Sequence, residues 1–96
     1  MTQRLYFEDA YRKEFDARVL ERLVHEGRPA VVLDRTGFYP ESGGQPSDRG
    51  ILGSANVLHV LEEGDRIVHL LDRELSETGD VCGVIDWARR FDHMQQ

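Results

Sequence analysis

A stretch rich in glycine and proline, residues 36–50, most constrains how this 96-residue chain can fold. Its glycines and prolines are Gly37, Pro40, Gly43, Gly44, Pro46 and Gly50. Proline fixes φ and lacks an amide donor, and a Gly-Gly pair admits backbone angles closed to other residues. Neither a regular helix nor a regular strand can continue through such a segment. We therefore predict an ordered loop over residues 36–50 that crosses one end of the fold, with Gly43 or Gly44 at positive φ; a long surface connection is the alternative.

Short β-rich runs flank this loop and recur about every ten residues, with turn residues between them. They lie at 30–33, 50–52, 56–61, 66–71 and 81–86. Short strands at such intervals predict a mainly β fold, a small antiparallel β-barrel. The clearest hairpin joins the third and fourth of these runs through the acidic turn 62–65. The polar sequence from Trp87 onwards predicts the start of a short C-terminal helix, with Asp86 as its N-cap.

The segment 14–25 fits two kinds of element. Phe15, Ala17 and Val19 alternate with charged residues, which is typical of a half-buried strand. An apolar stripe at helical spacing also runs from Val19 to Val24, and neither proline nor glycine interrupts the segment. Periodicity alone leaves helix and strand open.

The composition is that of one globular domain with a modest core. Hydrophobic residues make up 40% and charged residues 31% of the chain, which favours folding over disorder. No apolar run approaches the roughly 20 residues of a membrane helix, and the N-terminus lacks the apolar stretch of a secretory signal. The single cysteine, Cys82, lies in an apolar run, where we expect a small buried thiol. These features predict a cytoplasmic protein without a membrane partner.

Charge and histidine content bear on partners and metals. The formal net charge is −6, and an acidic domain is a poor electrostatic partner for nucleic acid. If the turn of the predicted hairpin has three residues, His59 lies opposite His69. Two histidines fall short of the three or four protein ligands of a zinc site. We therefore interpret both as half-exposed imidazoles on the polar face and predict that this chain binds no metal.

The order of residues in the central loop resembles the glycine-rich motif of the alanyl-tRNA editing family. This family comprises the free-standing AlaX-type proteins and the editing region of alanyl-tRNA synthetase. The resembling segments are Leu33-Asp34, Thr36, Phe38-Tyr39-Pro40-Glu41, Gly43-Gly44-Gln45 and Asp48-Arg49-Gly50. A second match runs from Asp86 to Gln96. Two motifs in the family's order are more specific than either alone, and the resemblance extends over essentially the whole chain.

The resemblance implies a translation-protein-like barrel in which 14–25 is a long, bent strand. It also implies that residues 1–96 form a single domain that stops before the family's zinc-binding editing domain. The first zinc ligands would belong to a His-x-x-x-His motif just after Gln96, so His93 would be a helix residue near the site and not a ligand. Zinc is accordingly expected in the full-length protein and none in this chain, which we expect to be inactive by itself.

The function implied by the resemblance is hydrolysis of the ester that joins a wrong amino acid, chiefly serine, to the tRNA for alanine. Most of the contact with this tRNA would be made outside the chain. The start at Met1 favours a free-standing editing protein over an editing-region fragment of alanyl-tRNA synthetase. A stand-alone small β-barrel binding module without chemistry is the alternative from another class. The sequence leaves the oligomeric state open.

Four loop residues are candidates for substrate binding, and none is a candidate for catalysis. Thr36 and Gln45 offer a hydroxyl and a carboxamide at the two ends of the loop, which can tell a seryl from an alanyl group by hydrogen bonding. Gly43 and Gly44 would let the backbone approach the substrate closely. Ser42 stands where many relatives have a third glycine, a departure from the family's pattern.

Two carboxylates and three aromatic residues near the loop have structural interpretations. We expect Asp34 and Asp48 to bond loop amides, as Asp commonly does, and not to act as an acid and a base. Phe38, Tyr39 and Trp87 are expected to pack the loop and the final helix against the barrel in preference to stacking on a nucleotide base.

Overall fold

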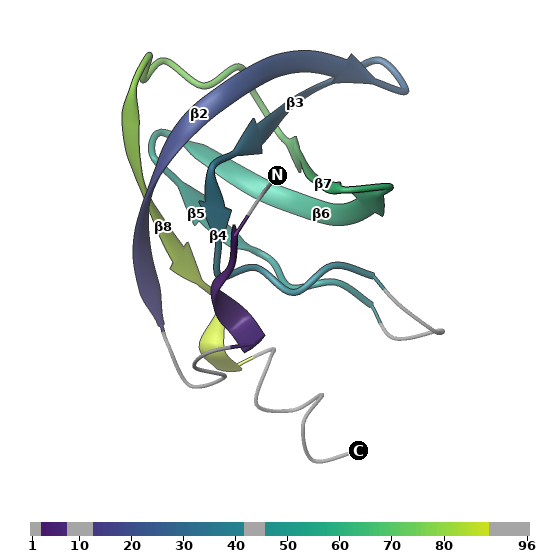
Figure 1. Ribbon diagram of the computed structural model, residues 1–96. Helices are drawn as coiled ribbons and strands as arrows, with labels where there is room; N and C mark the ends of the chain where they lie inside the picture. The colour runs from purple at the N-terminus through teal and green to yellow at the C-terminus, as the bar shows by residue number, and fades with distance from the viewer. Residues whose placement is uncertain (1–2, 8–12, 42–45, 89–96) are drawn as a thin grey trace.

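A computed structural model describes residues 3–7, 13–41 and 46–88. These residues form a closed barrel with the strand order β2-β3-β7-β6-β5-β8. The strands are β2 (Glu14–His25), β3 (Arg28–Leu33), β5 (Gly50–Leu52), β6 (Ala55–Glu63), β7 (Arg66–Leu71) and β8 (Asp80–Ile85). Neighbouring strands are antiparallel, and β2 closes the barrel against β8. The predicted mainly β fold with a small antiparallel barrel is therefore confirmed (Figure 1).

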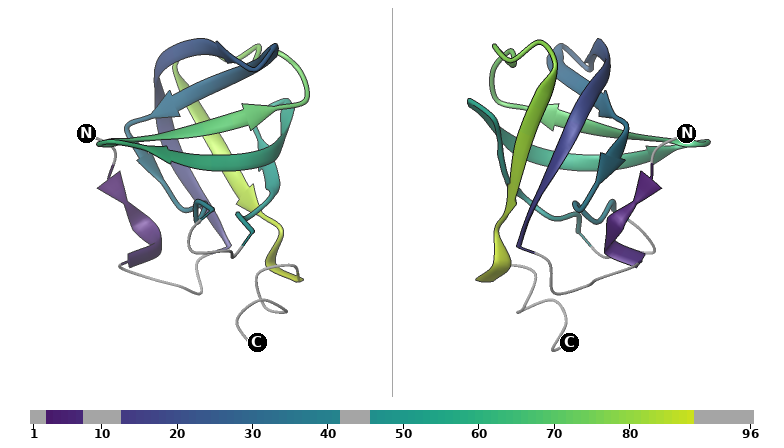
Figure 2. Two further views of the ribbon diagram at one scale, coloured as in Figure 1. Left: turned by 90° about the vertical axis from the view of Figure 1, so that its right-hand side faces the viewer. Right: turned by 60° about the vertical axis from the view of Figure 1, so that its left-hand side comes forward.

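Two short strands and a 3-10 turn lie at the lower end of the barrel, as Figures 1 and 2 are oriented. β1 (Gln3–Arg4) pairs in parallel with β4 (Arg35–Thr36), and η1 (Leu5–Phe7) follows β1 directly. Leu5 and Tyr6 are both buried, and Leu5 joins the main core cluster. The N-terminal segment thus helps to cover this end of the barrel.

β2 is long because it pairs on both of its sides in succession. Its first part, Glu14 to Arg18, pairs with β8, and its second part pairs with β3 from Val19 onwards. The register shifts at Leu20, whose side chain is 55% exposed. A bulge of this kind bends a strand and increases its twist, and Figure 1 shows β2 arching over the barrel. Residues 14–25 are therefore a long, bent strand, and the helical stripe does not form.

Positive φ marks the tight turns between strands. Glu26 and Gly27, between β2 and β3, have φ of 53° and 79°, the signs that a two-residue type I′ turn requires. Gly53 and Gly64 have φ of 57° and 61° in the turns that end β5 and β6. The β6–β7 connection has only two residues between its last paired residues, Glu63 and Arg66.

The barrel interior is filled by apolar side chains that alternate along the strands. Phe15 from β2 lies directly against the backbone of two glycines. A Cβ atom on Gly83 would lie 2.5 Å from Phe15 Cζ, and one on Gly37 would lie 2.8 Å from Phe15 Cδ1. Interiors are close-packed, so these positions have no space for a side chain. The ring also meets Phe38 edge to face, with 5.3 Å between the ring centroids.

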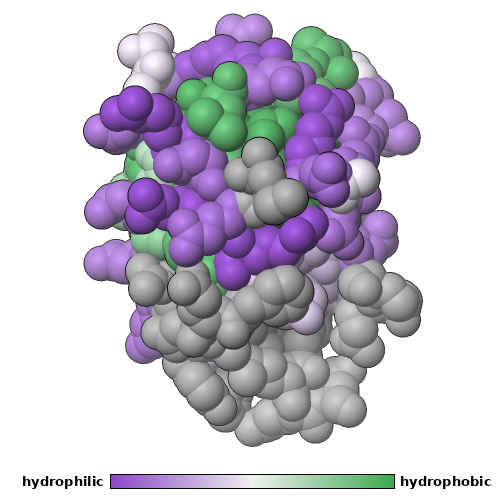
Figure 3. Space-filling model, in the orientation of Figure 1, coloured by the Kyte–Doolittle hydropathy of each residue, from purple (hydrophilic) through white to green (hydrophobic). Residues whose placement is uncertain are grey.

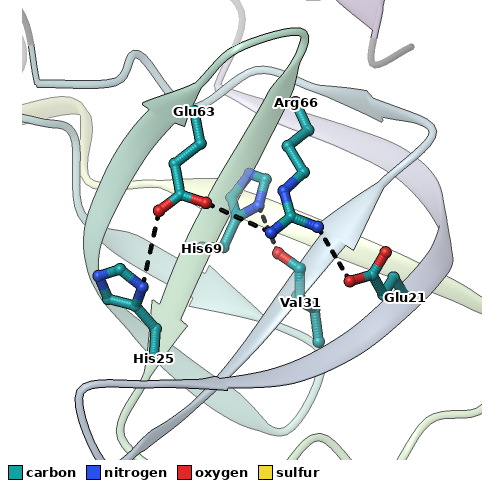
Figure 4. A network of polar contacts seen from close by, with 6 residues as sticks. All are labelled: Glu21, His25, Val31, Glu63, Arg66 and His69. Atoms are coloured by element: carbon teal, nitrogen blue, oxygen red, sulfur yellow. Dashed lines mark hydrogen bonds and ion pairs between the residues drawn. The ribbon is translucent and has the colours of Figure 1, made fainter.

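A second, smaller apolar cluster consists of the residues of β3 and β7 that face away from the barrel interior. Its buried members are Ala30, Val32, Val68 and Leu70. Arg66 shares this outer face and donates to Glu21 at 3.0 Å and to Glu63 at 3.3 Å, so its side chain lies across the strands (Figure 4). Figure 3 shows hydrophilic residues over most of the described part of one face, with hydrophobic residues gathered mainly near its top.

β8 alternates strictly between inward and outward residues. Val81, Gly83 and Ile85 are buried, whereas Cys82 and Val84 are exposed. The expectation of a buried thiol is therefore wrong, because the apolar run at Cys82 is one-sided. Partial desolvation raises the pKa of Cys82, so the thiol form predominates at pH 7.

A helix begins at Trp87 and Ala88, the last described residues, in agreement with the prediction from the sequence. Asp86 precedes it, and the Asp86 amide donates to the Arg49 carbonyl oxygen at 2.8 Å, which ties the helix start to the strand pair β5–β8. Within the described part of the chain, no helix is long and apolar enough to cross a membrane.

Candidate functional site

Thr36 lies at the lower end of the barrel and has no exposed surface. It ends β4, which follows β3 after the single residue Asp34. Its Oγ1 lies 2.8 Å from His69 Nε2 and accepts a hydrogen bond from the Phe38 amide at 3.0 Å. The hydroxyl therefore joins the first residues of the central loop to the barrel interior. Its predicted contact with a substrate is not tested by this geometry and stays a prediction.

His69 is the polar residue at the centre of this arrangement. It faces inwards from β7, has no exposed surface, and places Nδ1 3.1 Å from the Val31 carbonyl oxygen (Figure 4). The Phe38 ring packs edge to face against the imidazole, with 5.8 Å between the centroids. Desolvation by burial lowers the pKa of His69 to about 4, against the smaller opposing effect of the Val31 carbonyl. The ring is therefore neutral at pH 7.

The predicted pairing of His59 with His69 is wrong by one residue. His59 lies opposite Leu70, and His69 lies opposite Val60. The prediction assumed a turn of three residues, whereas Gly64 and the next residue form the turn alone. A shift of one residue reverses the face of every side chain in a strand. His69 consequently points into the core, and the interpretation of two half-exposed imidazoles holds for His59 only.

His59 lies on the outer face of β6, where it contacts both sides of the loop. Its Nδ1 is 3.2 Å from Ser47 Oγ, and its Nε2 is 3.5 Å from a Glu41 carboxylate oxygen. Ser47 is buried and accepts the Val60 amide at 3.0 Å, and the Glu41 amide donates to the Val60 carbonyl oxygen at 2.9 Å. β6 thus holds the segments before and after the tip of the loop.

Asp34 and Asp48 both bond backbone amides, but only Asp48 bonds an amide of the loop, as predicted for both. Asp48 is buried, its Oδ2 accepts the Tyr39 amide at 2.7 Å, and its own amide donates to the Tyr39 carbonyl oxygen at 2.9 Å. This reciprocal pair ties the two sides of the loop to each other. Asp34 Oδ1 accepts the Arg18 amide at 2.7 Å, next to the bulge in β2. Both carboxylates are structural in this geometry.

The aromatic residues of the loop divide between the core and the surface. Phe38 is fully buried, as predicted for a packing residue. Tyr39 packs against Tyr6 with 4.5 Å between ring centroids but remains 46% exposed. Trp87 is partly buried at the start of the helix. Of these three residues, Phe38 therefore packs in the core, whereas Tyr39 lies at the surface beside the loop.

Several predicted positions lie outside the described residues. Gly43, Gly44 and Gln45 are among them, with Ser42 and His93. The prediction of positive φ at Gly43 or Gly44, and the substrate contacts of these glycines and of Gln45, therefore stay predictions. The described parts of the loop, 36–41 and 46–50, are ordered by the hydrogen bonds that Thr36, Ser47 and Asp48 make.

The described residues do not fit a zinc ion. In residues 3–7, 13–41 and 46–88, no three side chains of His, Cys, Asp or Glu converge in a way that could hold a metal. His59 and His69 face opposite sides of the sheet, which removes the pair that the register prediction had placed together. The prediction that the chain binds no zinc still requires a metal measurement.

Sequence reasoning missed the roles of His69 and Ser47. The strand gave no signal for the inward face of His69, because Ile67 and Leu71 on one face and Val68 and Leu70 on the other are all apolar. No local signal marks Ser47, a loop residue whose partners Val60 and His59 lie on β6.

Comparison with known proteins places this barrel in a family. The model of the class II (A) tRNA synthetases matches residues 8–89. The chain is 48% identical over 94 residues to an alanine–tRNA ligase of Ignicoccus hospitalis, covering 94% of this chain and 10% of that protein. It is 46% identical over 100 residues to the alanine–tRNA ligase of Pyrococcus furiosus, covering 98% of this chain and 10% of the ligase.

A free-standing relative matches equally well. The alanyl-tRNA editing protein AlaX-M of Methanosarcina barkeri is 47% identical over 106 residues, covering 99% of this chain and 42% of that protein. The chain belongs to the class II (A) tRNA synthetase family, within the group that includes alanyl-tRNA synthetases and AlaX-type editing proteins. It spans about a tenth of the length of the ligases and less than half of the editing protein.

Proposed function

We propose that this chain is the barrel portion of an alanyl-tRNA editing protein, which deacylates tRNA for alanine that carries a wrong amino acid, chiefly serine. The observation that supports this most is the 47% identity to the AlaX-M editing protein across 99% of this chain. The similarity to the ligases agrees with it, because the same barrel would then serve as part of an editing region within alanyl-tRNA synthetase. The proposed role implies a cytoplasmic location.

The residues of this chain would contribute to substrate binding and not to bond cleavage. Thr36 and Gln45 would meet the aminoacyl group, and Gly43 and Gly44 would let the loop backbone lie close to it. A site built to hydrogen-bond a hydroxyl rejects a ligand without one, because its own buried polar groups then lose their partner. Serine and alanine differ by just such a hydroxyl.

The tRNA would be bound mainly by other parts of the protein. The chain has a net charge of −6, which repels a polyanion. Several arginines are also paired with carboxylates: Arg4 with Glu62 at 2.6 Å and Arg66 with Glu21 at 3.0 Å. Such pairs leave little net positive charge for phosphates. We expect weak tRNA binding by residues 1–96 alone.

The zinc ion implied by the family resemblance would be held outside this chain. The described residues do not offer a set of ligands for it, since no three candidate side chains converge among them. The part played by this chain is therefore to shape and line one wall of the aminoacyl site.

A chimaera tests the proposed function. Residues 1–96 would replace the matching region of the Methanosarcina barkeri AlaX-M protein, and deacylation of seryl- and alanyl-tRNA for alanine would be measured. We expect the chimaera to hydrolyse the seryl ester faster than the alanyl ester, and residues 1–96 alone to leave both intact. The parent editing protein is the positive control.

Two outcomes would contradict the proposal. A folded chimaera that retains the zinc content of the parent but shows no hydrolysis would favour a binding module without chemistry. Hydrolysis of both esters at equal rates would show that this barrel does not contribute to discrimination.

A further inference from the structure

The hydrogen bonds around His69 determine which ring nitrogen carries the proton. Nδ1 lies 3.1 Å from the carbonyl oxygen of Val31, which can only accept. Nδ1 must therefore carry the proton and donate it. Because burial lowers the pKa of His69 to about 4, the ring is neutral at pH 7 and Nε2 presents a lone pair.

The His69 tautomer in turn fixes the proton of Thr36. Nε2 lies 2.8 Å from Thr36 Oγ1 and can only accept, so Thr36 donates its single hydroxyl proton to His69. The Phe38 amide donates to the same oxygen at 3.0 Å and occupies one of its two lone pairs. The oxygen retains one lone pair and has no proton left to donate.

We propose that His69 is a positioning residue that sets the hydrogen-bond polarity of Thr36, so that Thr36 meets a ligand as an acceptor only. The inference deepens the proposed function and rests on it for the contact between Thr36 and an aminoacyl group. Such an oxygen pairs with a seryl hydroxyl, which can donate, and finds no partner in an alanyl methyl group. It also disfavours ligand groups that only accept.

The core of the barrel, and not the ligand, determines this polarity. Val31 and Phe38 are both buried and contact the imidazole, Val31 through its carbonyl oxygen and Phe38 through its ring. Thr36 has no exposed surface in this chain, so a ligand reaches Oγ1 only where the groups that cover it are displaced. The bond from Thr36 to His69 lies on the core side, and it persists while the imidazole keeps its position.

The first arm of the test measures the tautomer in residues 1–96. Two-bond ¹H–¹⁵N correlation spectra of histidine-labelled protein at pH 7 report the protonation of each ring nitrogen. We expect His69 to carry a proton on Nδ1 and none on Nε2, and to keep this tautomer in Thr36→Val. A proton on Nε2, or a rapid mixture of tautomers, would overturn the proposal. This arm does not depend on the editing function.

The second arm measures discrimination in the chimaera with AlaX-M, as the ratio of kcat/KM for seryl- over alanyl-tRNA. The variant His69→Phe removes the acceptor of the Thr36 hydroxyl. It should lower the ratio by about 2- to 12-fold, which corresponds to the net contribution of one hydrogen bond. His69→Gln, whose carbonyl oxygen can accept from Thr36, should restore most of it. In a Thr36→Val background, His69→Phe should cause no further loss.

Leu52→Val is the matched control, because Leu52 is a fully buried residue of the same core on β5. It should lower the melting temperature without changing the ratio. An equal effect of His69→Phe with and without the Thr36 hydroxyl, or no effect at all, would overturn the proposal. If the unmutated chimaera were inactive, the proposed function would fail, and the tautomer measurement would decide the role of His69 alone.

Discussion

His59 and His69 belong to the same hairpin, yet they have opposite surroundings. His69 has no exposed surface, bonds the Thr36 hydroxyl and is held neutral by burial. His59 is partly exposed and contacts Ser47 and Glu41 on the outside of the barrel. The central loop is thus fixed from the barrel interior at its first residues and from the outer face near its tip.

The difference shows how strongly turn length controls the chemistry of a strand. With a two-residue turn, His69 shares its inward face with Ile67 and Leu71. One more residue in the turn would exchange the two faces of a strand relative to its partner. The same type of side chain then becomes either a buried acceptor for the Thr36 hydroxyl or a partly exposed ring that contacts Ser47 and Glu41.

The largest expected effect is the difference in stability between alanine variants of the two histidines. His69→Ala leaves a cavity and an unpaired Thr36 hydroxyl, and should lower the free energy of unfolding by about 2–5 kcal/mol. His59→Ala removes a partly exposed ring and should lower it by less than about 1 kcal/mol. Urea denaturation of both variants provides the comparison. Equal losses would show that the two rings do not differ in burial.

Lowering the pH should lower the free energy of unfolding through protonation of His69. Because the folded pKa of His69 is about 4 and its ordinary value is 6.5, the unfolded state binds the proton first as pH falls. The contribution of His69 is fully present above pH 6.5 and is lost between pH 6.5 and 4, on the order of 3 kcal/mol. Unfolding free energies at pH 7, 5.5 and 4 test this. His69→Gln should lose less than wild type over that range, and an identical slope would rule out the explanation.

Two hydroxyl deletions should have effects of intermediate size. They test separately the hydrogen bond that holds the start of the loop and the one that holds the loop to β6. Thr36→Val removes the acceptor of the Phe38 amide, and Ser47→Ala removes the acceptor of the Val60 amide. Each leaves one buried amide unpaired and should cost about 1–3 kcal/mol. Hydrogen exchange should accelerate chiefly at Phe38 in the first variant and chiefly at Val60 in the second. Acceleration at both amides in both variants would mean that the attachments are not separate.

The smallest effects are expected from substitutions in the β2–β3 and β6–β7 turns, which set the registers of these two strand pairs. Glu26 has a φ of 53° in the β2–β3 turn, a conformation that suits asparagine better. Glu26→Asn should therefore stabilise the protein by about 0.5 kcal/mol, whereas Gly64→Ala, at a φ of 61°, should destabilise it by about 1 kcal/mol. Thermal melts measure both changes. Stabilisation by the Gly64 variant would contradict a left-handed backbone conformation at this position.

Much of the fold could be predicted from the sequence because its signals are local. Alternation and turn residues indicate the hairpin and the barrel, and the family resemblance resolved 14–25 as a strand. The register could not be predicted, because Glu62-Glu63-Gly64-Asp65 allows turns of two or three residues. The exposure of Cys82 was missed because an apolar run does not show which of its faces is covered.

The candidate site was predictable only in part. The structural role of Asp48 follows from the loop motif, since its partner Tyr39 lies in the same loop. The partner of Asp34 is the Arg18 amide on β2, which the motif does not indicate. The partners of Thr36 and Ser47 do not follow from the motif either, because His69 and Val60 reach them only when β6 and β7 close against the loop. Such contacts depend on tertiary structure and leave no local pattern.

His69 lies inside the barrel as a neutral imidazole, with its Nε2 2.8 Å from Thr36 Oγ1. The most direct measurement is an NMR titration of the His69 ring in residues 1–96 from pH 8 to pH 3. The structure predicts a midpoint near pH 4, with Nδ1 protonated throughout and Nε2 gaining its proton only at that midpoint. A midpoint near the ordinary value of 6.5 would place His69 in solvent and contradict both the register and the role proposed for it.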